Sequence, residues 1–149
     1  MARNLQCTSY MIGEPVNLTF HPPVRGSMLV VEDVEPCRRL LLALLHSRGY
    51  DAQGVGSAEE ALELLQRSGD GRPCWIVVDV DLPGISGLEL VKQVSKSCPD
   101  IRAMFVTGAD GKKIRRFCDH HRHPVDYFPK PLDVPLFLDH IHRLQQQLH

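Results

Sequence analysis

Five short segments rich in apolar or β-branched residues alternate with longer segments in which apolar residues recur every three or four positions. The longer segments predict amphipathic helices, and an unbroken apolar run predicts a strand buried on both faces. The expected strands are 28–31, 50–55, 75–78, 103–106 and 125–128. A helical segment follows each strand, so the pattern predicts an α/β fold with a doubly wound, five-stranded parallel sheet and helices on both faces.

Local signals place the ends of the predicted helices. Pro36 suits a first helical turn, Gly49 suits a stop, and residues 57–60 form a capping box. Pro99 ends a helix that starts near residue 88, and Asp133 is expected to cap the last helix. The apolar side of the first helix is expected to contain Leu40, Leu41, Leu44 and Leu45. That of the last helix is expected to contain Leu136, Phe137, Ile141, Leu144 and Leu148.

Composition narrows the class of protein. The 149 residues, 43% of them apolar and 23% charged, predict one globular domain with a substantial core. The formal net charge of −1 gives no field that favours nucleic acid or membrane partners, and no apolar block is long enough for a membrane span. An odd number of scattered cysteines without a CxxC motif favours a reducing compartment, so a cytoplasmic location is expected. Residues 1–26 lack periodicity and are expected to form a mobile tail before a domain at 27–149.

Polar residues follow four of the predicted strands directly. Asp33, Asp79, Thr107 and Lys130 each stand after a different strand, and Glu32 precedes Asp33. The carboxyl ends of parallel strands meet at one edge of the sheet, so these side chains are expected to form one site. Two carboxylates at about 4 Å repel by about 4 kcal/mol at an effective dielectric constant near 20, and a cation is needed to balance them. An all-oxygen ligand set suits Mg²⁺.

This set of groups favours phosphoryl transfer. Asp79 would be the nucleophile and would form an acyl phosphate. Mg²⁺ and Lys130 would balance the charge of the phosphoryl oxygens, and Thr107 would donate a hydrogen bond to one of them.

The same residues carry a resemblance to a known family. The segments 30–33, 77–84, 106–108 and 130–131 resemble, in this order and spacing, the motifs of response regulator receiver domains, the chemotaxis-type module of bacterial two-component signalling. The resemblance spans about residue 27 to the C-terminus. It implies the flavodoxin-like strand order 2-1-3-4-5, which is carried over from the family.

The resemblance implies a role for each acidic residue of the site. Asp79 would be the phosphoacceptor and a metal ligand, and Asp33 would be the main metal-binding acid. Glu32 would assist indirectly. The main-chain carbonyl of Asp81 would be a further ligand to Mg²⁺.

It also implies roles for residues on the last two strands. Lys130 would contact the phosphoryl group, and its peptide bond to Pro131 would be cis. Thr107 and Tyr127 would form a switch pair. Phosphorylation is expected to turn the Thr107 hydroxyl toward the phosphoryl group and to let Tyr127 swing inward.

The function expected from this resemblance is a receiver switched by phosphorylation. Asp79 would accept a phosphoryl group from a sensor histidine kinase or a histidine phosphotransfer protein, with only self-catalysed phosphorylation and dephosphorylation as chemistry. Because no output domain is expected after the last helix, the output would be contact with an unknown downstream protein or onward phosphotransfer. Two alternatives stay open for the chemistry: a phosphorylation-independent scaffold, and a Mg²⁺-dependent phosphatase with Asp81 as general acid. The chain could also be a receiver cut from a longer protein.

Four features depart from the family pattern or invite a second interpretation. Gly108 stands where the family has a small residue with a side chain, and residues 119–124 replace the usual small-residue entry to the fifth strand. His120, His121 and His123 form either a transition-metal cluster or a polar turn. In the basic helix predicted at 112–121, the cations are either a docking patch for an acidic partner or a solvated face; they are Lys112, Lys113, Arg115 and Arg116.

Overall fold

The structure, a computed structural model, describes residues 27–121 and 125–147. Strands and helices alternate along these residues, with one short 3₁₀ turn. In order they are β1 (Ser27–Val31), α2 (Glu35–Ser47), β2 (Asp51–Val55), α3 (Ala58–Ser68), η4 (Gly69–Gly71), β3 (Trp75–Val78), α4 (Gly87–Ser97), β4 (Arg102–Thr107), α5 (Gly111–His120), β5 (Val125–Pro129) and α6 (Val134–Gln147). The tail expected at 1–26 lies outside the described residues.

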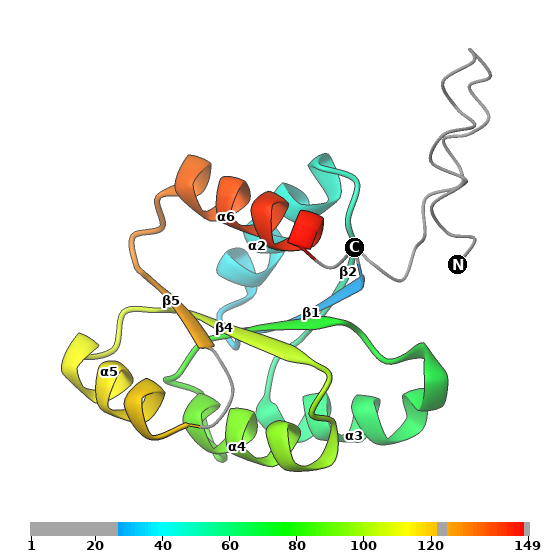
Figure 1. The fold of residues 1–149 in the computed structure, drawn as a ribbon, viewed down its shortest axis with the longest axis vertical. Helices are drawn as coiled ribbons and strands as arrows, with labels where there is room; N and C mark the ends of the chain where they lie inside the picture. Colours follow the sequence, from blue (N-terminus) through cyan, green and yellow to red (C-terminus); the bar gives the residue numbers. More distant parts are fainter. Residues whose placement is uncertain (1–26, 122–124, 148–149) are drawn as a thin grey trace.

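The five strands form one parallel sheet in the order β2-β1-β3-β4-β5. This confirms both the predicted doubly wound fold and the strand order 2-1-3-4-5. Helices α2 and α6 cover one face of the sheet, and α3, α4 and α5 cover the other (Figure 1). No helix in the described part of the chain combines the length and the apolar character that a membrane span requires.

The side chains of each strand point alternately to two separate cores. In β1, Leu29 and Val31 face the core under α3, α4 and α5, whereas Met28 and Val30 face the core under α2 and α6. The central strand β3 is buried along its whole length. A strand flanked by apolar layers on both sides needs apolar residues at every position, which explains the unbroken runs in the sequence.

Side-chain caps start two of the helices, α3 and α6, as the sequence predicts or nearly so. The Ser57 hydroxyl accepts a hydrogen bond from the Glu60 amide at 3.1 Å, and the Glu60 carboxylate accepts one from Gly56 at 2.7 Å. The second bond lies one residue earlier than in an ideal capping box. Asp133 Oδ1 accepts from the Leu136 amide at 3.1 Å, which confirms the expected cap of α6.

Two residues expected on apolar helix faces are exposed. Leu40 of α2 is 55% exposed and Leu136 of α6 is 52% exposed, so the prediction was wrong at both positions. Each lies beside a core residue in sequence, Leu41 and Phe137, and a helix turns about 100° per residue. Two neighbouring residues of a helix therefore cannot both point fully at the sheet. In each pair the second residue, Leu41 or Phe137, faces the core. Leu148, the last residue of the predicted face, lies outside the described residues.

Candidate functional site

Asp79 stands directly after β3, at the carboxyl edge of the sheet. Its amide donates to the Val31 carbonyl at 3.1 Å, which continues the ladder between β1 and β3 by one residue. The residue is 8% exposed. The first residue of α4, Gly87, donates its amide to the Val80 carbonyl at 3.0 Å. A Cβ on Gly87 would overlap the Asp79 carbonyl oxygen, so α4 packs on the Asp79 backbone at a position that only glycine fits.

Three donors surround the Asp79 carboxylate. Thr107 Oγ1 donates to Oδ1 at 2.6 Å, and the Asp81 amide donates to the same oxygen at 3.1 Å. Lys130 Nζ donates to Oδ2 at 3.2 Å. Thr107 is fully buried at the end of β4, and Lys130 follows β5, so three strands bring these groups together. The structure therefore joins the residues that the sequence placed at separate strand ends.

Glu32 is the second acidic partner of Lys130 and is 1% exposed. Its Oε1 accepts from Lys130 Nζ at 2.7 Å, and its Oε2 accepts from the Val34 amide at 3.2 Å. Burial raises the pKa of the Glu32 carboxyl, while the bond from Lys130 partly offsets this effect. Burial by itself would lower the pKa of Lys130, but the hydrogen bond to Glu32 and the charge of Asp79 outweigh it and raise the pKa. Lys130 therefore stays an ammonium group at neutral pH.

The acidic residues form a group that fits a hard cation. Carboxylate oxygens of Glu32, Asp33 and Asp79 lie within 4.8 Å of one another, with Asp33 exposed and the other two buried. Three carboxylates face one ammonium group, so the pocket has an excess of negative charge that a divalent cation would balance. The metal role of Asp33 and of the Asp81 carbonyl stays a prediction.

The remaining predicted site residues lie on β5 and just after it. The peptide bond between Lys130 and Pro131 is cis, and the Lys130 amide donates to the Thr107 carbonyl at 3.0 Å. Tyr127 is half-buried and pairs in register with Phe105 of β4. Its hydroxyl lies 3.6 Å from the point where a Cβ on Gly111 would stand, so it faces the start of α5.

Two polar side chains support the site without having been predicted to do so. Arg38 of α2 donates from Nη1 to the Glu32 carbonyl at 2.8 Å and so holds the backbone of the acidic turn. Glu59 of α3 accepts from the Ile85 amide at 3.1 Å and holds the loop between Asp79 and α4. Arg38 stands in a helix with no motif around it, and Glu59 was interpreted only as part of a capping box, so their roles depend on tertiary contacts.

The histidine cluster considered in the sequence is not fully described. His120 and His121 end α5 and follow it, whereas His123 lies outside the described residues. Among the described residues, the only group of three or more acidic, histidine or cysteine side chains placed for a metal is Glu32, Asp33 and Asp79. The described residues therefore give no support to a second metal site.

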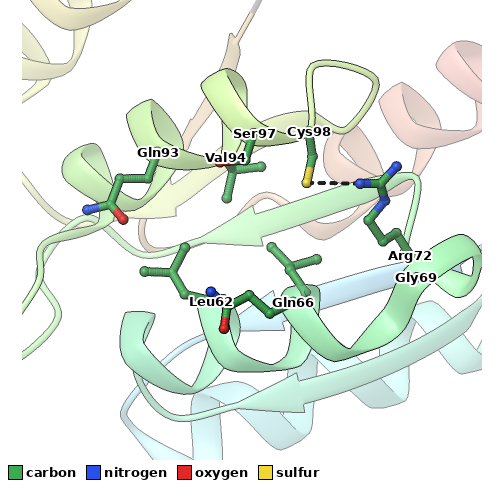
Figure 2. A pocket seen from close by; sticks show the side chains of 9 residues that line it. Leu62, Gln66, Gly69, Arg72, Gln93, Val94, Ser97 and Cys98 are labelled. Atoms are coloured by element: carbon green, nitrogen blue, oxygen red, sulfur yellow. Dashed lines mark hydrogen bonds between the residues drawn. The ribbon is translucent and has the colours of Figure 1, made fainter.

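A pocket of about 360 Å³ lies between α3 and α4 (Figure 2). Figure 2 shows Arg72 directed at Cys98, with Nη1 3.3 Å from Sγ. None of the predicted site residues lines this pocket. The pocket is therefore separate from the residue cluster at the carboxyl edge of the sheet.

Comparison with known proteins agrees with this geometry. A family model described as the response regulator receiver domain matches residues 28–142. The chain belongs to this family. Its role is that of a phosphorylation-switched receiver domain of two-component signalling, and such domains are generally signalling modules that histidine kinases phosphorylate. Receiver domains typically bind Mg²⁺ at the acidic pocket.

Individual relatives show how far the similarity extends. The receiver is 31% identical to the polar-differentiation response regulator DivK of Brucella anthropi over 123 residues, which cover 77% of this chain and 92% of DivK. It is 32% identical to the transcriptional regulatory protein BtsR of Salmonella typhi, covering 80% of this chain and 48% of BtsR. The chain thus spans about half of the length of several curated relatives.

A solved structure of a receiver protein is also similar to this chain. The crystal structure of a response regulator receiver protein from Pseudomonas putida superposes with a TM-score of 0.70 at 29% identity, covering 78% of this chain and 94% of that one.

Proposed function

We propose that Asp79 is the phosphoacceptor and that its donor is a phosphohistidine of a sensor histidine kinase or a histidine phosphotransfer protein. The observation that carries this proposal is the buried Asp79 carboxylate between the Thr107 hydroxyl, at 2.6 Å, and the Lys130 ammonium, at 3.2 Å. We also propose that residues 27–149 form the receiver unit, separate from 1–26, and that the protein acts in the cytoplasm.

The transfer is an in-line displacement at phosphorus. A carboxylate oxygen of Asp79 attacks, the bond between phosphorus and the imidazole nitrogen breaks, and its electron pair stays on the histidine of the donor. Negative charge spreads over the three equatorial oxygens during this step. Lys130 balances part of it, and Glu32 holds the ammonium in position through a 2.7 Å hydrogen bond. Water later hydrolyses the acyl phosphate and resets the receiver.

The acidic pocket would hold the cation that this reaction needs. Asp33, Asp79 and the carbonyl of Asp81 would be its ligands, with Glu32 in support. Bound Mg²⁺ would neutralise charge on the phosphoryl oxygens and on the carboxylates. Asp33 is the exposed member of the acidic group, so it is accessible to a hydrated ion.

The switch starts from a hydrogen bond that already exists. Thr107 Oγ1 donates to Asp79 in this structure, so phosphorylation needs to transfer the bond to a phosphoryl oxygen and does not need a large rotation of Thr107. The Ala109 amide donates to the same hydroxyl at 3.2 Å, which links it to the loop before α5. Tyr127 faces the start of α5 and would respond to movement of this loop.

The acceptor assignment is tested with a small phosphodonor and Mg²⁺. Intact-mass spectrometry should find one added phosphoryl group, labile to hydroxylamine, that is absent in Asp79→Asn. Asp81→Asn is the matched control, because Asp81 is an exposed acid two residues away and should keep labelling. Labelling that persists in Asp79→Asn, or that disappears only in Asp81→Asn, contradicts the assignment.

The same experiment separates the two alternatives. A phosphatase with Asp81 as general acid would release phosphate continuously and accumulate no acyl phosphate, whereas a receiver traps it. A phosphorylation-independent scaffold would show no labelling. Removal of Mg²⁺ with a chelator should abolish labelling, and Asp33→Asn should weaken Mg²⁺ binding measured by calorimetry.

A further inference from the structure

A groove lies between side chains of α4 and α5. These two helices are on the face of the sheet opposite α2 and α6 (Figure 1). It consists of two hollows of about 730 Å³ and 340 Å³ that share Lys92, His120 and His121 as lining residues. Neither hollow contains a residue of the phosphoacceptor site. Both helices begin next to that site, since α4 follows the Asp79 loop and α5 follows the Thr107 loop.

The groove carries a local excess of positive charge. Four exposed cations line it, Lys92 and Lys96 from α4 and Lys113 and Arg116 from α5. None of the four forms an ion pair with a described residue. The one acid in the lining, Glu89, accepts a hydrogen bond from Gln93 at 3.2 Å. This concentration is local, because the whole chain has a formal net charge of −1.

Helix geometry separates the cations of α5 into two sets. Lys113, Arg116 and His120 are three or four residues apart and share the face that lines the groove. Lys112 and Arg115 are exposed on the same helix, but they line neither hollow. The basic helix noted in the sequence is therefore a groove wall on one face and a solvated surface on the other.

The groove also has an apolar, ordered part. Leu88 and Phe117 line the smaller hollow and are half-buried. The Phe117 ring stacks on His121 with centroids 4.9 Å apart, and His121 Nε2 lies 3.0 Å from the Ser95 hydroxyl of α4. This bond joins the two walls at one end of the groove, so the cations are held on a defined frame.

We propose that this groove is a docking surface for an acidic segment of a partner protein, with Asp and Glu side chains on the four cations and an apolar side chain on Phe117 and Leu88. An apolar contact beside a small number of cations suits a peptide better than nucleic acid, which requires an extended basic surface along its phosphates. The chain's own residues 1–26 have the wrong charge, since Arg3 and Arg25 outnumber Glu14. The inference deepens the proposed function by locating the contact with the partner, and it rests on that function for its role in signalling.

Fluorescence anisotropy with the full chain tests the proposal. The probe is a fluorescein-labelled peptide rich in Glu and Asp with one central Leu, and the reference peptide has Gln and Asn in place of the acids. Saturable binding of the acidic peptide at physiological salt should weaken about tenfold in the double variant Lys92→Glu with Arg116→Glu. The matched control, Lys112→Glu with Arg115→Glu, makes the same change in net charge outside the groove and should alter the affinity less than about twofold.

Three results would overturn the proposal. These are equal weakening in both double variants, equal binding of the Gln and Asn peptide, and tighter binding of a DNA duplex or of anionic vesicles that the acidic peptide cannot displace. Sedimentation of the chain alone adds a fourth, because self-association lost only in the groove variant would assign the groove to a second copy.

Lys92→Gln with Arg116→Gln replaces the reversal variant if circular dichroism shows that the latter is unfolded. Phosphorylation by the small phosphodonor is measured in parallel. Labelling of Asp79 without groove binding removes only this inference, whereas absence of labelling in the wild-type chain removes the proposed function.

Discussion

Helices α4 and α5 occupy similar places in the fold but are held very differently. Each follows a strand that ends at the site, and each has a side-chain cap, with Ser86 accepting from Glu89 at 3.2 Å and Asp110 from Lys112 at 3.0 Å. Helix α4 then buries four residues, Gly87, Leu90, Val91 and Val94. Helix α5 buries only Ile114. The number of buried side chains largely determines how much free energy is needed to move a helix, so α5 is expected to move more readily than α4.

The first residue of each helix shows the same difference. Gly87 leaves no room for a Cβ against the Asp79 backbone, whereas a Cβ on Gly111 would meet only the Tyr127 side chain, its hydroxyl at 3.6 Å and its ring at 3.9 Å. The backbone at Asp79 is thus packed directly against the start of α4, whereas the start of α5 faces the Tyr127 side chain. A change at Asp79 and Thr107 is therefore expected to reach the surface through α5, while α4 serves as the fixed wall of the groove.

The largest expected effect tests the close contact between the start of α4 and the Asp79 backbone. Gly87→Ala should destabilise the protein by about 3 kcal/mol, because the added methyl group overlaps a backbone atom that cannot rotate away. Gly111→Ala is the matched control and should be neutral or stabilise by about 0.5 kcal/mol, since alanine favours the helix and the contact with Tyr127 is ordinary. Urea unfolding of both variants measures the difference. Equal free energies of unfolding would contradict the distinction between the two helix starts.

The second largest expected effect tests whether α5 can open separately from the rest of the domain. Ile114→Ala removes the one buried side chain of α5 and should cost about 2 kcal/mol or more in local stability. Hydrogen exchange should speed up in the amides of α5 with little change in α4, because α5 can open without the rest of the core. Val91→Ala is the control on α4, and its loss should appear across the whole domain. Uniform acceleration in Ile114→Ala would show that α5 unfolds only with the whole protein.

A smaller effect is expected in the loop that leads to α5. A Cβ on Gly108 would meet no atom within 4 Å, and Gly108 has no positive φ. Gly108→Ala should therefore stabilise the receiver by about 0.5 kcal/mol, by restricting the unfolded chain. Thermal unfolding with and without Mg²⁺ measures this gain. Destabilisation would mean that the loop needs a conformation that alanine cannot adopt.

The smallest effect concerns reaction rate and leaves stability unchanged. Burial, with the nearby charges of Asp119 and Asp126, raises the pKa of the Cys118 thiol in α5. At a given pH below that pKa, less thiolate is present than in an unfolded chain, so iodoacetamide should modify Cys118 more slowly. The rate should rise with pH, and it should rise further in Ile114→Ala if α5 opens. A rate equal to that of the denatured protein would contradict the burial of this thiol.

Much of the site could be predicted because strand ends are visible in the sequence. Each site residue stands at or just after the end of a predicted strand, and a parallel sheet brings such positions to one edge. These residues are Glu32, Asp33, Asp79, Thr107 and Lys130. The supporting residues Arg38 and Glu59 were not predicted, because their partners are main-chain groups distant in sequence or outside any motif. Leu40 and Leu136 were misplaced because neighbouring leucine or phenylalanine residues compete for one helix face.

The sequence by itself determined the succession of strands and helices along the chain, the fold class and the residues that meet at the carboxyl edge. These follow from periodicity and from the chirality of parallel connections, which are local or nearly universal constraints. The tertiary structure decided that Lys130 bridges Glu32 and Asp79 and that Thr107 already donates to Asp79. It also decided that α4 buries four residues whereas α5 buries one. It also decided which face of α5 joins α4 to form a basic groove. Such features depend on distances of a few ångströms between segments far apart in the chain, and only the packed fold sets those distances.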